Sequence, residues 1–274
     1  MAGSPGWRER IVVIKLGGSI LVRPAAYKRA ASFVRNRLRT HAHEKLVIVV
    51  SAQEGTTDRL ERGAKKIVRE PNAAALDLLW STGEIRSVAV LALELQALGV
   101  QTASLNIHQA GLSVFENGSD NFQFGRTAQC NPEKLFSVLG KYPVAIVPGF
   151  FATDSEQAIA SLGRGGSDLT AVLLAQALQA CRCELIKDVP GYFTSDPHKN
   201  SDASPISQLT FEQALELADS GCDLVQRKAI EAAQSRGLPL VVRSLNENEP
   251  MSRIVDIEVA ESVTREITSA VEAF

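Results

Sequence analysis

Residues 161–170 of this chain read Ser161-Leu-Gly-Arg-Gly-Gly-Ser-Asp-Leu-Thr170, and the apolar run Ala171-Val-Leu-Leu-Ala-Gln-Ala-Leu178 follows directly. The three glycines allow positive φ and a close approach of a ligand to the backbone. Ser167 or Asp168 is placed to cap a helix that begins here, and a helix N-terminus offers N–H groups to an anion. Arg164 adds a planar fork suited to a carboxylate or phosphate. The stretch predicts an anion-binding loop at a helix start; an ordinary loop and N-cap is the alternative.

The composition is that of an ordinary globular protein. Of the 274 residues, 45% are hydrophobic and 22% are charged, and the formal net charge is −2. This charge indicates no general attraction to nucleic acid or to an anionic membrane. No apolar run approaches the roughly 20 residues that span a bilayer, and the first ten residues lack the apolar core of a signal peptide. We therefore expect a cytoplasmic protein without a nucleic-acid or membrane partner.

The four cysteines do not follow a zinc-binding pattern. Cys181 and Cys183 are separated by one residue, which is too close for the usual pair of zinc ligands. The four histidines form no metal pattern either. In a reducing compartment, free buried thiols are the expected state. The sequence therefore predicts no metal ion held by the protein alone.

Short apolar runs alternate with amphipathic stretches along the chain. The runs predict strands at residues 11–14, 45–50, 100–105, 142–148, 183–187 and 238–243. The amphipathic stretches predict helices at residues 24–40, 57–70, 72–98 (with one interruption at 81–84), 132–139, 167–180, 211–219 and 224–236. Two turn-rich segments predict hairpins, at 107–130 (alternatively a lid) and at 188–197. The tail from residue 253 predicts one short strand or helix.

This alternation predicts an α/β fold with a mostly parallel sheet that is covered by helices on both faces. Such sheets bind ligands beyond the carboxyl ends of their strands. The chain has no long linker rich in Pro or Ser. We expect two lobes on one continuous sheet, formed by residues 1–160 and residues 161–274.

A second glycine motif, Lys15-Leu-Gly-Gly-Ser19, follows the first predicted strand. Its glycines would let backbone N–H groups face phosphates, and Lys15 would neutralise charge between them. The motif is neither a Walker A loop nor the dinucleotide-binding fingerprint. A plain turn is the alternative interpretation.

Polar residues also follow the second predicted strand and interrupt the long helix. Ser51, Thr57 and Asp58 belong to the first group, and Thr57 is either a helix N-cap or a hydroxyl that contacts a ligand. Glu84 follows Gly83 inside the helical region. It is either a surface glutamate or a ligand for an amino group.

Together these motifs resemble the aspartokinase branch of the amino-acid kinase family. The matching motifs are Lys15–Ser19, Ser51–Ala52 with Gly55–Asp58, Ser81–Glu84, Pro148–Phe150, Leu162–Asp168, Asp188–Gly191 and Thr194–Pro197. The resemblance runs from about Ile11 to Val255, and Leu-Gly-Arg-Gly-Gly-Ser-Asp is its most specific part. It implies a three-layer αβα sandwich that moves the γ-phosphoryl group of ATP onto a carboxylate, carbamate or similar acceptor. Aspartokinases make β-aspartyl phosphate.

The resemblance also implies residue roles. Lys15 would bridge the transferring phosphoryl group, and Asp168 would orient Lys15. Glu84 would bind the ammonium group of the amino acid and Arg164 its α-carboxylate. The remaining acceptor residues would be Ser51, Thr57, Gly165, Gly166 and Ser167, and the phosphates would be lined by Gly17, Gly18 and Ser19. Catalysis would rest on alignment and charge neutralisation, with Mg²⁺ carried by ATP and no covalent intermediate.

The nucleotide side departs from the family pattern. Lys187, Phe193, His198 and Asp223 stand where the family usually has Thr, Tyr, Arg and Lys, respectively. Asp223 has the wrong sign for a group that faces ATP. Lys187, Arg227 or Lys228 could supply the missing cation from a new position, and the nucleotide-binding set that we expect here is Lys187, Asp188, Phe193, His198 and Lys228. Gln53 and Glu54 replace Met and Gly of the family, which is consistent with an altered acceptor.

The leading hypothesis is therefore a kinase that uses ATP and Mg²⁺ to phosphorylate the side-chain carboxylate of aspartate or a close analogue. Family analogy implies a homodimer, and the chain's end near the expected end of a catalytic domain implies no ACT regulatory domains. Two alternatives stay open. One is a kinase with another small acid as acceptor, and the other is a non-catalytic ligand-binding or partner-regulating homologue.

Overall fold

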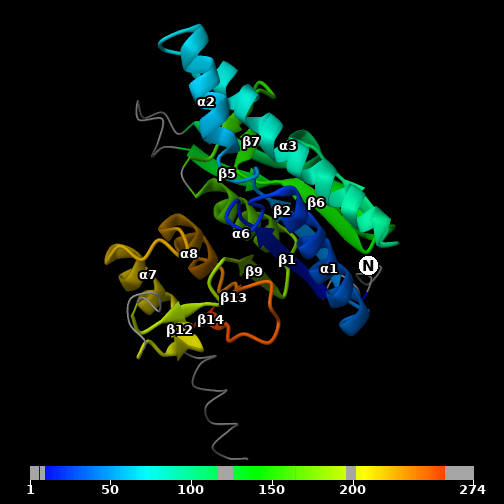
Figure 1. Cartoon of the computed structure of the whole chain (residues 1–274), viewed down its shortest axis with the longest axis vertical. Helices are drawn as coiled ribbons and strands as arrows, with labels where there is room; N and C mark the ends of the chain where they lie inside the picture. Colours follow the sequence, from blue (N-terminus) through cyan, green and yellow to red (C-terminus); the bar gives the residue numbers. More distant parts are fainter. Residues whose placement is uncertain (1–5, 7–9, 117–125, 164, 196–201, 257–274) are drawn as a thin grey trace, which may run out of the picture.

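The computed structural model describes residues 6, 10–116, 126–163, 165–195 and 202–256 of the chain. Its centre is an eight-stranded sheet whose strands lie in the order β12 (Gln208–Thr210), β14 (Ser252–Val255), β13 (Leu240–Arg243), β9 (Arg182–Ile186), β1 (Ile11–Leu16), β2 (Lys45–Val50), β6 (Val144–Pro148) and β3 (Thr102–Ser104). All neighbouring pairs are parallel except β13 and β14. Figure 1 shows this sheet running from β12 at the lower left to β6 at the upper right. The mostly parallel sheet of the sequence prediction is confirmed.

Helices cover both faces of the sheet and complete a three-layer αβα sandwich. On one face, α1 (Pro24–Thr40) and α3 (Ala73–Ala97) pack on the sheet. On the other face, the helices that join the core are α5 (Glu133–Leu139), α6 (Gly166–Ala177), α7 (Phe211–Asp219) and α8 (Arg227–Gln234). Both termini of α1 and of α7 agree with the sequence prediction.

The first strand explains why the sheet is buried on both sides. All six residues of β1 are buried. Val12 and Ile14 belong to the core beneath α1 and α3, whereas Ile11 and Val13 belong to the core on the opposite face. Alternate residues of a strand point to opposite faces, so a continuous apolar run suits a strand between two helical layers. Each such side chain contributes about 1.5–3 kcal/mol through its burial.

Smaller elements surround this sandwich. A four-stranded sheet has the order β5 (Arg126–Cys130), β4 (Leu112–Glu116), β7 (Phe151–Thr153) and β8 (Ile159–Ser161). Helix α2 (Thr56–Ile67) packs against α3, and the short helix α4 (Ile107–Ala110) packs against β7. The antiparallel pairing of β4 with β5 agrees with the predicted hairpin. The other predicted hairpin differs, because β10 (Tyr192–Phe193) pairs with β11 (Pro205–Ile206), beyond residue 197.

Three further sequence predictions are wrong. Helix α3 runs without interruption through residues 81–84. The Ser81 and Thr82 hydroxyls donate to the carbonyl oxygens three residues earlier, so these polar residues fit inside the helix. Helix α8 begins at Arg227 rather than at residue 224. Of the four free thiols only Cys183 is fully buried, whereas Cys181 is exposed at the residue before β9.

Four central strands end at the same level, and this edge positions the candidate site. Leu16 of β1 pairs with Val50 of β2 and with Ile186 of β9, and Val50 pairs with Pro148 of β6. The loops that follow these strands therefore meet at one edge of the sheet.

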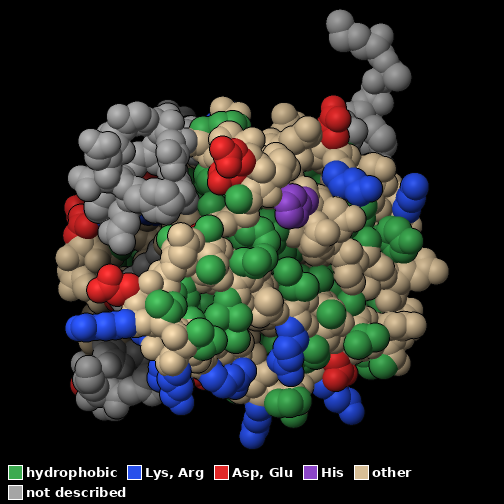
Figure 2. All heavy atoms as spheres, turned by 90° about the horizontal axis from the view of Figure 1, so that it is seen from above, with side chains coloured by type: hydrophobic (Ala, Val, Ile, Leu, Met, Phe, Trp, Pro, Cys, Tyr) green, Lys and Arg blue, Asp and Glu red, His purple; other side chains and the backbone are tan. Residues whose placement is uncertain are grey.

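Surface features vary around the molecule. Figure 2 shows hydrophobic side chains gathered in the middle of one face, with many Lys and Arg side chains along its lower rim. Large hydrophobic residues exposed on α3 include Leu78, Ile85 and Leu93. None of the described helices combines the length and the apolar composition that a membrane crossing requires.

Candidate active site

Two lysines share one buried carboxylate at the carboxyl edge of the sheet. Lys15 near the end of β1 forms an ion pair with Asp168 of α6, at 2.7 Å between Nζ and Oδ1. Lys187, directly after β9, donates a hydrogen bond to Oδ2 of the same carboxylate at 2.9 Å. Asp168 is only 2% exposed. Burial by itself raises the pKa of Asp168, but the two ammonium groups outweigh it and hold this pKa below its usual range.

The glycine loop before α6 places Asp168 beside Lys15, but the helix cap differs from the prediction. Gly165 is the N-cap residue of α6 with φ 76°, a left-handed conformation that favours glycine. Because Gly165 is the N-cap and α6 begins at Gly166, the prediction that Ser167 or Asp168 would cap the helix is wrong. Asp168 instead lies in the first turn, where its carboxylate pairs with the two lysines, and an anion there is favourable to the helix dipole.

Glu84 is buried inside α3 rather than exposed on the surface. The residue is 4% exposed, and Oε1 accepts a hydrogen bond from the Ala52 N–H at 3.2 Å. Oε2 is buried and has no hydrogen-bond partner among the described residues. Burial raises the pKa of Glu84 to about 7, against the lowering effect of the Ala52 hydrogen bond. A buried carboxylate oxygen without a partner can receive a donor such as an ammonium group.

A pocket of about 280 Å³ joins Glu84 to the glycine loops. Its lining includes four residues of the expected acceptor set, namely Ser51, Thr57, Glu84 and Ser167. Gly18 and Phe150 also line it. Thr57 is not the N-cap of α2, because that helix begins at Thr56 with Gly55 as its N-cap. The open alternative for Thr57 is therefore a pocket-lining hydroxyl.

The residues expected to bind the nucleotide range from buried to exposed. Gly17 is buried, Gly18 is half-buried and Ser19 is exposed in the loop after β1. Phe193 of β10 is half-buried, whereas Asp188 and Lys228 are exposed. Arg164 and His198 lie outside the described residues, as does the turn that would contain His198. Gly166 is buried at the start of α6.

Sequence reasoning missed two contacts that hold the loops. Phe150 has φ 72°, and its N–H donates to the Thr170 hydroxyl at 3.1 Å. Asp77 of α3 is 7% exposed and accepts a hydrogen bond from the Ser161 N–H at 3.0 Å. An aspartate within a mostly apolar helix is a signal that could have indicated the second contact. A left-handed phenylalanine has no such signal in the sequence.

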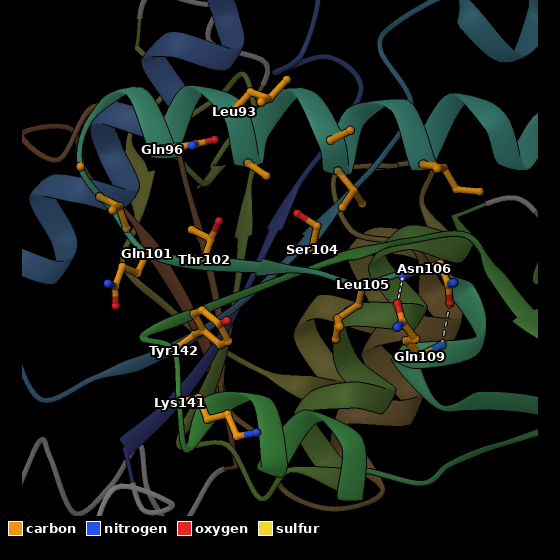
Figure 3. Close-up of a pocket in the computed structure, with 16 residues that line it drawn as sticks. Leu93, Gln96, Gln101, Thr102, Ser104, Leu105, Asn106, Gln109, Lys141 and Tyr142 are labelled. Carbon is orange, nitrogen blue, oxygen red and sulfur yellow. Dashed lines mark hydrogen bonds between the residues drawn. The ribbon is translucent and has the colours of Figure 1, made fainter.

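A larger pocket lies away from these loops, between α3 and the β3 edge of the sheet. It has a volume of about 1050 Å³, and none of the expected site residues that the structure describes lines it. Figure 3 shows Leu93 and Gln96 of α3 above Thr102 and Ser104 of β3, with Lys141 and Tyr142 below. Asn106 and Gln109 hydrogen-bond each other at one end, where they form the capping box of α4.

The sequence matches known proteins over most of its length. The model of the amino acid kinase family matches residues 10–244. The chain is 36% identical to an aspartokinase of Geobacillus stearothermophilus over 239 residues, which cover 87% of this chain and 57% of that protein. It is also 36% identical to an aspartokinase of Thermus thermophilus over 257 residues, covering 93% and 62%, respectively. The chain therefore spans about three fifths of the length of these relatives.

Solved structures of aspartate kinases also resemble this chain over most of its length. A crystal structure of aspartate kinase from Synechocystis superposes with a TM-score of 0.77 at 33% identity, covering 90% of this chain and 40% of that one. The aspartokinase III of E. coli in complex with aspartate and ADP has a TM-score of 0.71 at 24% identity, covering 90% and 64%. At that lower identity the similarity supports the fold alone.

Proposed function

The chain belongs to the amino acid kinase family, and on this premise we propose that it transfers the γ-phosphoryl group of ATP to the side-chain carboxylate of aspartate or a close analogue. The proposal is consistent with the aspartokinases of Geobacillus stearothermophilus and Thermus thermophilus, which match over most of this chain.

The observation that carries this proposal is that the pocket at Glu84 reaches the loops that hold Lys15 and Asp168. The pocket that contains Glu84 is also lined by Gly18 and Ser167. These two residues are the chain neighbours of Gly17, which lies against Lys15, and of Asp168, which binds it. An amino acid bound with its ammonium group at Glu84 would therefore extend toward Lys15, as an acceptor of a phosphoryl group must.

The reaction needs no proton transfer and no covalent enzyme intermediate. A carboxylate oxygen of the acceptor forms a bond to the γ-phosphorus, and the bond from that phosphorus to the β-phosphate oxygen breaks. ADP leaves with the negative charge on its β-phosphate. Lys15 would stabilise the charge on the transferring group, with Asp168 holding its ammonium in place. Arg164 would bind the α-carboxylate, and Thr57, Ser51 and the glycines 165 and 166 would shape the rest of the acceptor site.

The residues around Lys15 fit a phosphate group. A Cβ atom added to Gly17 would lie 3.1 Å from Lys15 Nζ, so the absence of a side chain leaves room around the ammonium. Gly18 and Ser19 continue the same loop, and the N-terminus of α6 adds the positive end of a helix dipole. Among the described residues, no three His, Cys, Asp or Glu side chains gather as a metal site requires. Mg²⁺ would arrive bound to the phosphates of ATP, as it usually does in kinases.

Acceptor binding and nucleotide binding would fall to different halves of the chain. We propose that residues 1–160 form the acceptor-binding lobe, which contains Ser51, Thr57 and Glu84. Residues 161–274 would form the nucleotide-binding lobe, with Asp188, Phe193, His198 and Lys228 as further nucleotide contacts. Use of ATP is consistent with the proposed cytoplasmic location.

Hydroxylamine trapping tests this function directly. Purified protein is incubated with ATP, Mg²⁺ and aspartate, and the acyl phosphate is captured as a hydroxamate. We expect a product that requires all three reactants and disappears in the Lys15→Met variant. A panel of other small acids tests the acceptor, because Gln53 and Glu54 differ from the usual family residues. ATP-dependent product with another acid but not with aspartate would contradict the assigned acceptor. No product with any acid would contradict the kinase proposal.

We also propose a homodimer formed through the outer edge of β3 and the adjoining face of α3. Among the 16 described residues that line the large pocket there, Lys141 is the one that carries a charge. Leu93 is 64% exposed and Ile85 is 40% exposed beside it. Two copies related by a twofold axis would pair their β3 edges in antiparallel fashion, which is self-complementary.

Light scattering after size-exclusion chromatography tests the dimer. The wild-type mass should be twice that of one chain, and Leu93→Glu should give a monomer because it places a carboxylate in the apolar contact. An exposed leucine elsewhere, Leu78, provides the matched Leu78→Glu control. A wild-type monomer, or a dimer unchanged by Leu93→Glu, would contradict this interface.

A further inference from the structure

Lys187 occupies a fixed position beside Lys15 although the two are far apart in the sequence. β9 is the parallel neighbour of β1, and Leu16 pairs with Ile186. Lys187 is therefore the first residue beyond the paired strands, at the level of Gly17. Its side chain is 13% exposed, and its ammonium lies 2.9 Å from Asp168 Oδ2. The sheet register and this contact together direct Lys187 into the candidate active site rather than into solvent.

The charge balance around Asp168 favours an additional anion. Two ammonium groups share one carboxylate, which leaves one positive charge that the three groups do not neutralise. Burial lowers the pKa of Lys187, and the charge of Lys15 acts in the same direction, while Asp168 and, more weakly, Asp188 oppose both. Asp188 is exposed, so solvent screens its charge. A buried excess positive charge is costly unless an anion approaches it. A phosphate group would relieve this cost.

The other two candidate cations are less suited to this task. Arg227 is 46% exposed and already forms ion pairs with Asp219 and Glu231. Lys228 is exposed at the start of α8. Asp223, where the family usually has lysine, is exposed in the turn before α8. Lys187 contacts the carboxylate that also holds Lys15.

We propose that Lys187 is a catalytic residue that binds the β-phosphate of the nucleotide and the bridging oxygen on which negative charge develops. This inference rests on the proposed kinase function. Lys15 contacts the transferring phosphoryl group, Lys187 contacts the leaving ADP, and Asp168 keeps their two ammonium groups at a fixed separation. Lys187 would act through its positive charge and transfer no proton, so its contribution is electrostatic. Lys187, which follows β9, would thereby take the role of the lysine that the family usually has at the position of Asp223.

The test compares Lys187→Met with wild type, Lys187→Arg and a matched surface variant, Lys134→Met. Lys134 is exposed on α5 and lies outside the site. Hydroxamate formation gives kcat and the KM values for ATP and acceptor, and calorimetry gives the affinity for ADP. Loss of one group that stabilises developing charge typically lowers kcat about 100-fold. We expect a loss of this order in Lys187→Met, together with weaker ADP binding and an unchanged acceptor KM. Lys187→Arg should recover ADP affinity because it keeps the charge, and Lys134→Met should match wild type.

The outcomes separate this proposal from the kinase proposal. An active wild type with unchanged kcat and ADP affinity in Lys187→Met would overturn the role of Lys187 alone. A lower kcat with unchanged ADP affinity would mean that Lys187 acts only by positioning Asp168, which also overturns the phosphate contact. If wild type forms no acyl phosphate with any acid, the kinase proposal fails, and ADP affinity still tests Lys187. Wild type that binds no ADP would overturn both. Circular dichroism of each variant verifies folding, and Lys187→Arg keeps the test valid if Lys187→Met is unfolded.

Discussion

The Glu84 carboxylate accepts a hydrogen bond from the backbone N–H of Ala52, which ties the middle of α3 to the loop after β2. Only Oε1 is used in this contact, and Oε2 stays buried without a hydrogen-bond partner in the part of the chain that the structure describes. The same residue therefore holds the pocket wall and presents an acceptor atom. The raised pKa of Glu84 makes both roles testable.

Amino-acid affinity should increase with pH through neutrality. Because burial raises the pKa of Glu84 to about 7, the free site is largely protonated at pH 6 and ionised at pH 8. An ammonium group prefers the ionised form, so affinity for aspartate should rise about tenfold between these pH values and then level off. Calorimetric titration measures it. Glu84→Gln should bind more weakly with little pH dependence, and an equally steep profile in that variant would contradict the assignment.

Protein stability should change with pH in the opposite direction. Glu84 has a folded-state pKa of about 7 and an ordinary value of 4.5. Between these values the folded state binds a proton that the unfolded state lacks, so stability falls as pH rises across this window. The shift corresponds to about 3 kcal/mol in the free energy of unfolding. Urea unfolding at pH 4.5 and pH 8 should show this component in wild type and not in Glu84→Gln. Parallel pH profiles for the two proteins would refute it.

Two glycines inside helices should respond differently to alanine. A Cβ added to Gly83 of α3 would lie 2.9 Å from the Ala52 Cβ, whereas one added to Gly63 of α2 would meet nothing within 4 Å. Gly63→Ala should therefore stabilise the protein by up to about 1 kcal/mol through helix propensity. Gly83→Ala should lose that gain to overpacking of about 1–3 kcal/mol and should weaken acceptor binding. Thermal unfolding and KM for the acceptor measure both effects, and identical behaviour of the two variants would disprove the close contact.

A charge network at the other end of β9 should matter for stability rather than for catalysis. Glu184 is 1% exposed and accepts hydrogen bonds from Arg37 and Arg182, which both also bind Glu44. Glu184→Gln removes one buried carboxylate while Arg37 keeps its ion pair with Glu44, so it should cost about 1–3 kcal/mol of the free energy of unfolding. The kcat of the folded protein should be unchanged, because this network lies near the amino end of β9 and the site at its carboxyl end. Arg182 is more exposed than Arg37, so Arg182→Met should cost less than Arg37→Met.

Much of the fold follows from local patterns. The run Lys45–Val50 is a strand with the predicted bounds, and residues 24–40 form the predicted helix, because hydrophobic periodicity is a property of neighbouring residues. The predicted break in α3 was wrong because polar residues can bond back to their own helix. The cap at Ser167 or Asp168 was wrong because α6 begins at Gly166, which places both residues inside its first turn.

The sequence by itself determined the αβ alternation, the mostly parallel sheet and the loops that would follow its strands, since these depend on residues close together in the chain. The pairing of Asp168 with Lys15 was implied by the family resemblance. Only the tertiary structure decided that Glu84 is buried against Ala52 and that Lys187 binds the second oxygen of the Asp168 carboxylate. Those contacts depend on which strands become neighbours and on their register. Because β1 and β9 are neighbours, Lys15 and Lys187 lie close together although they are more than 150 positions apart in the sequence. Both lysines then pair with the buried carboxylate of Asp168.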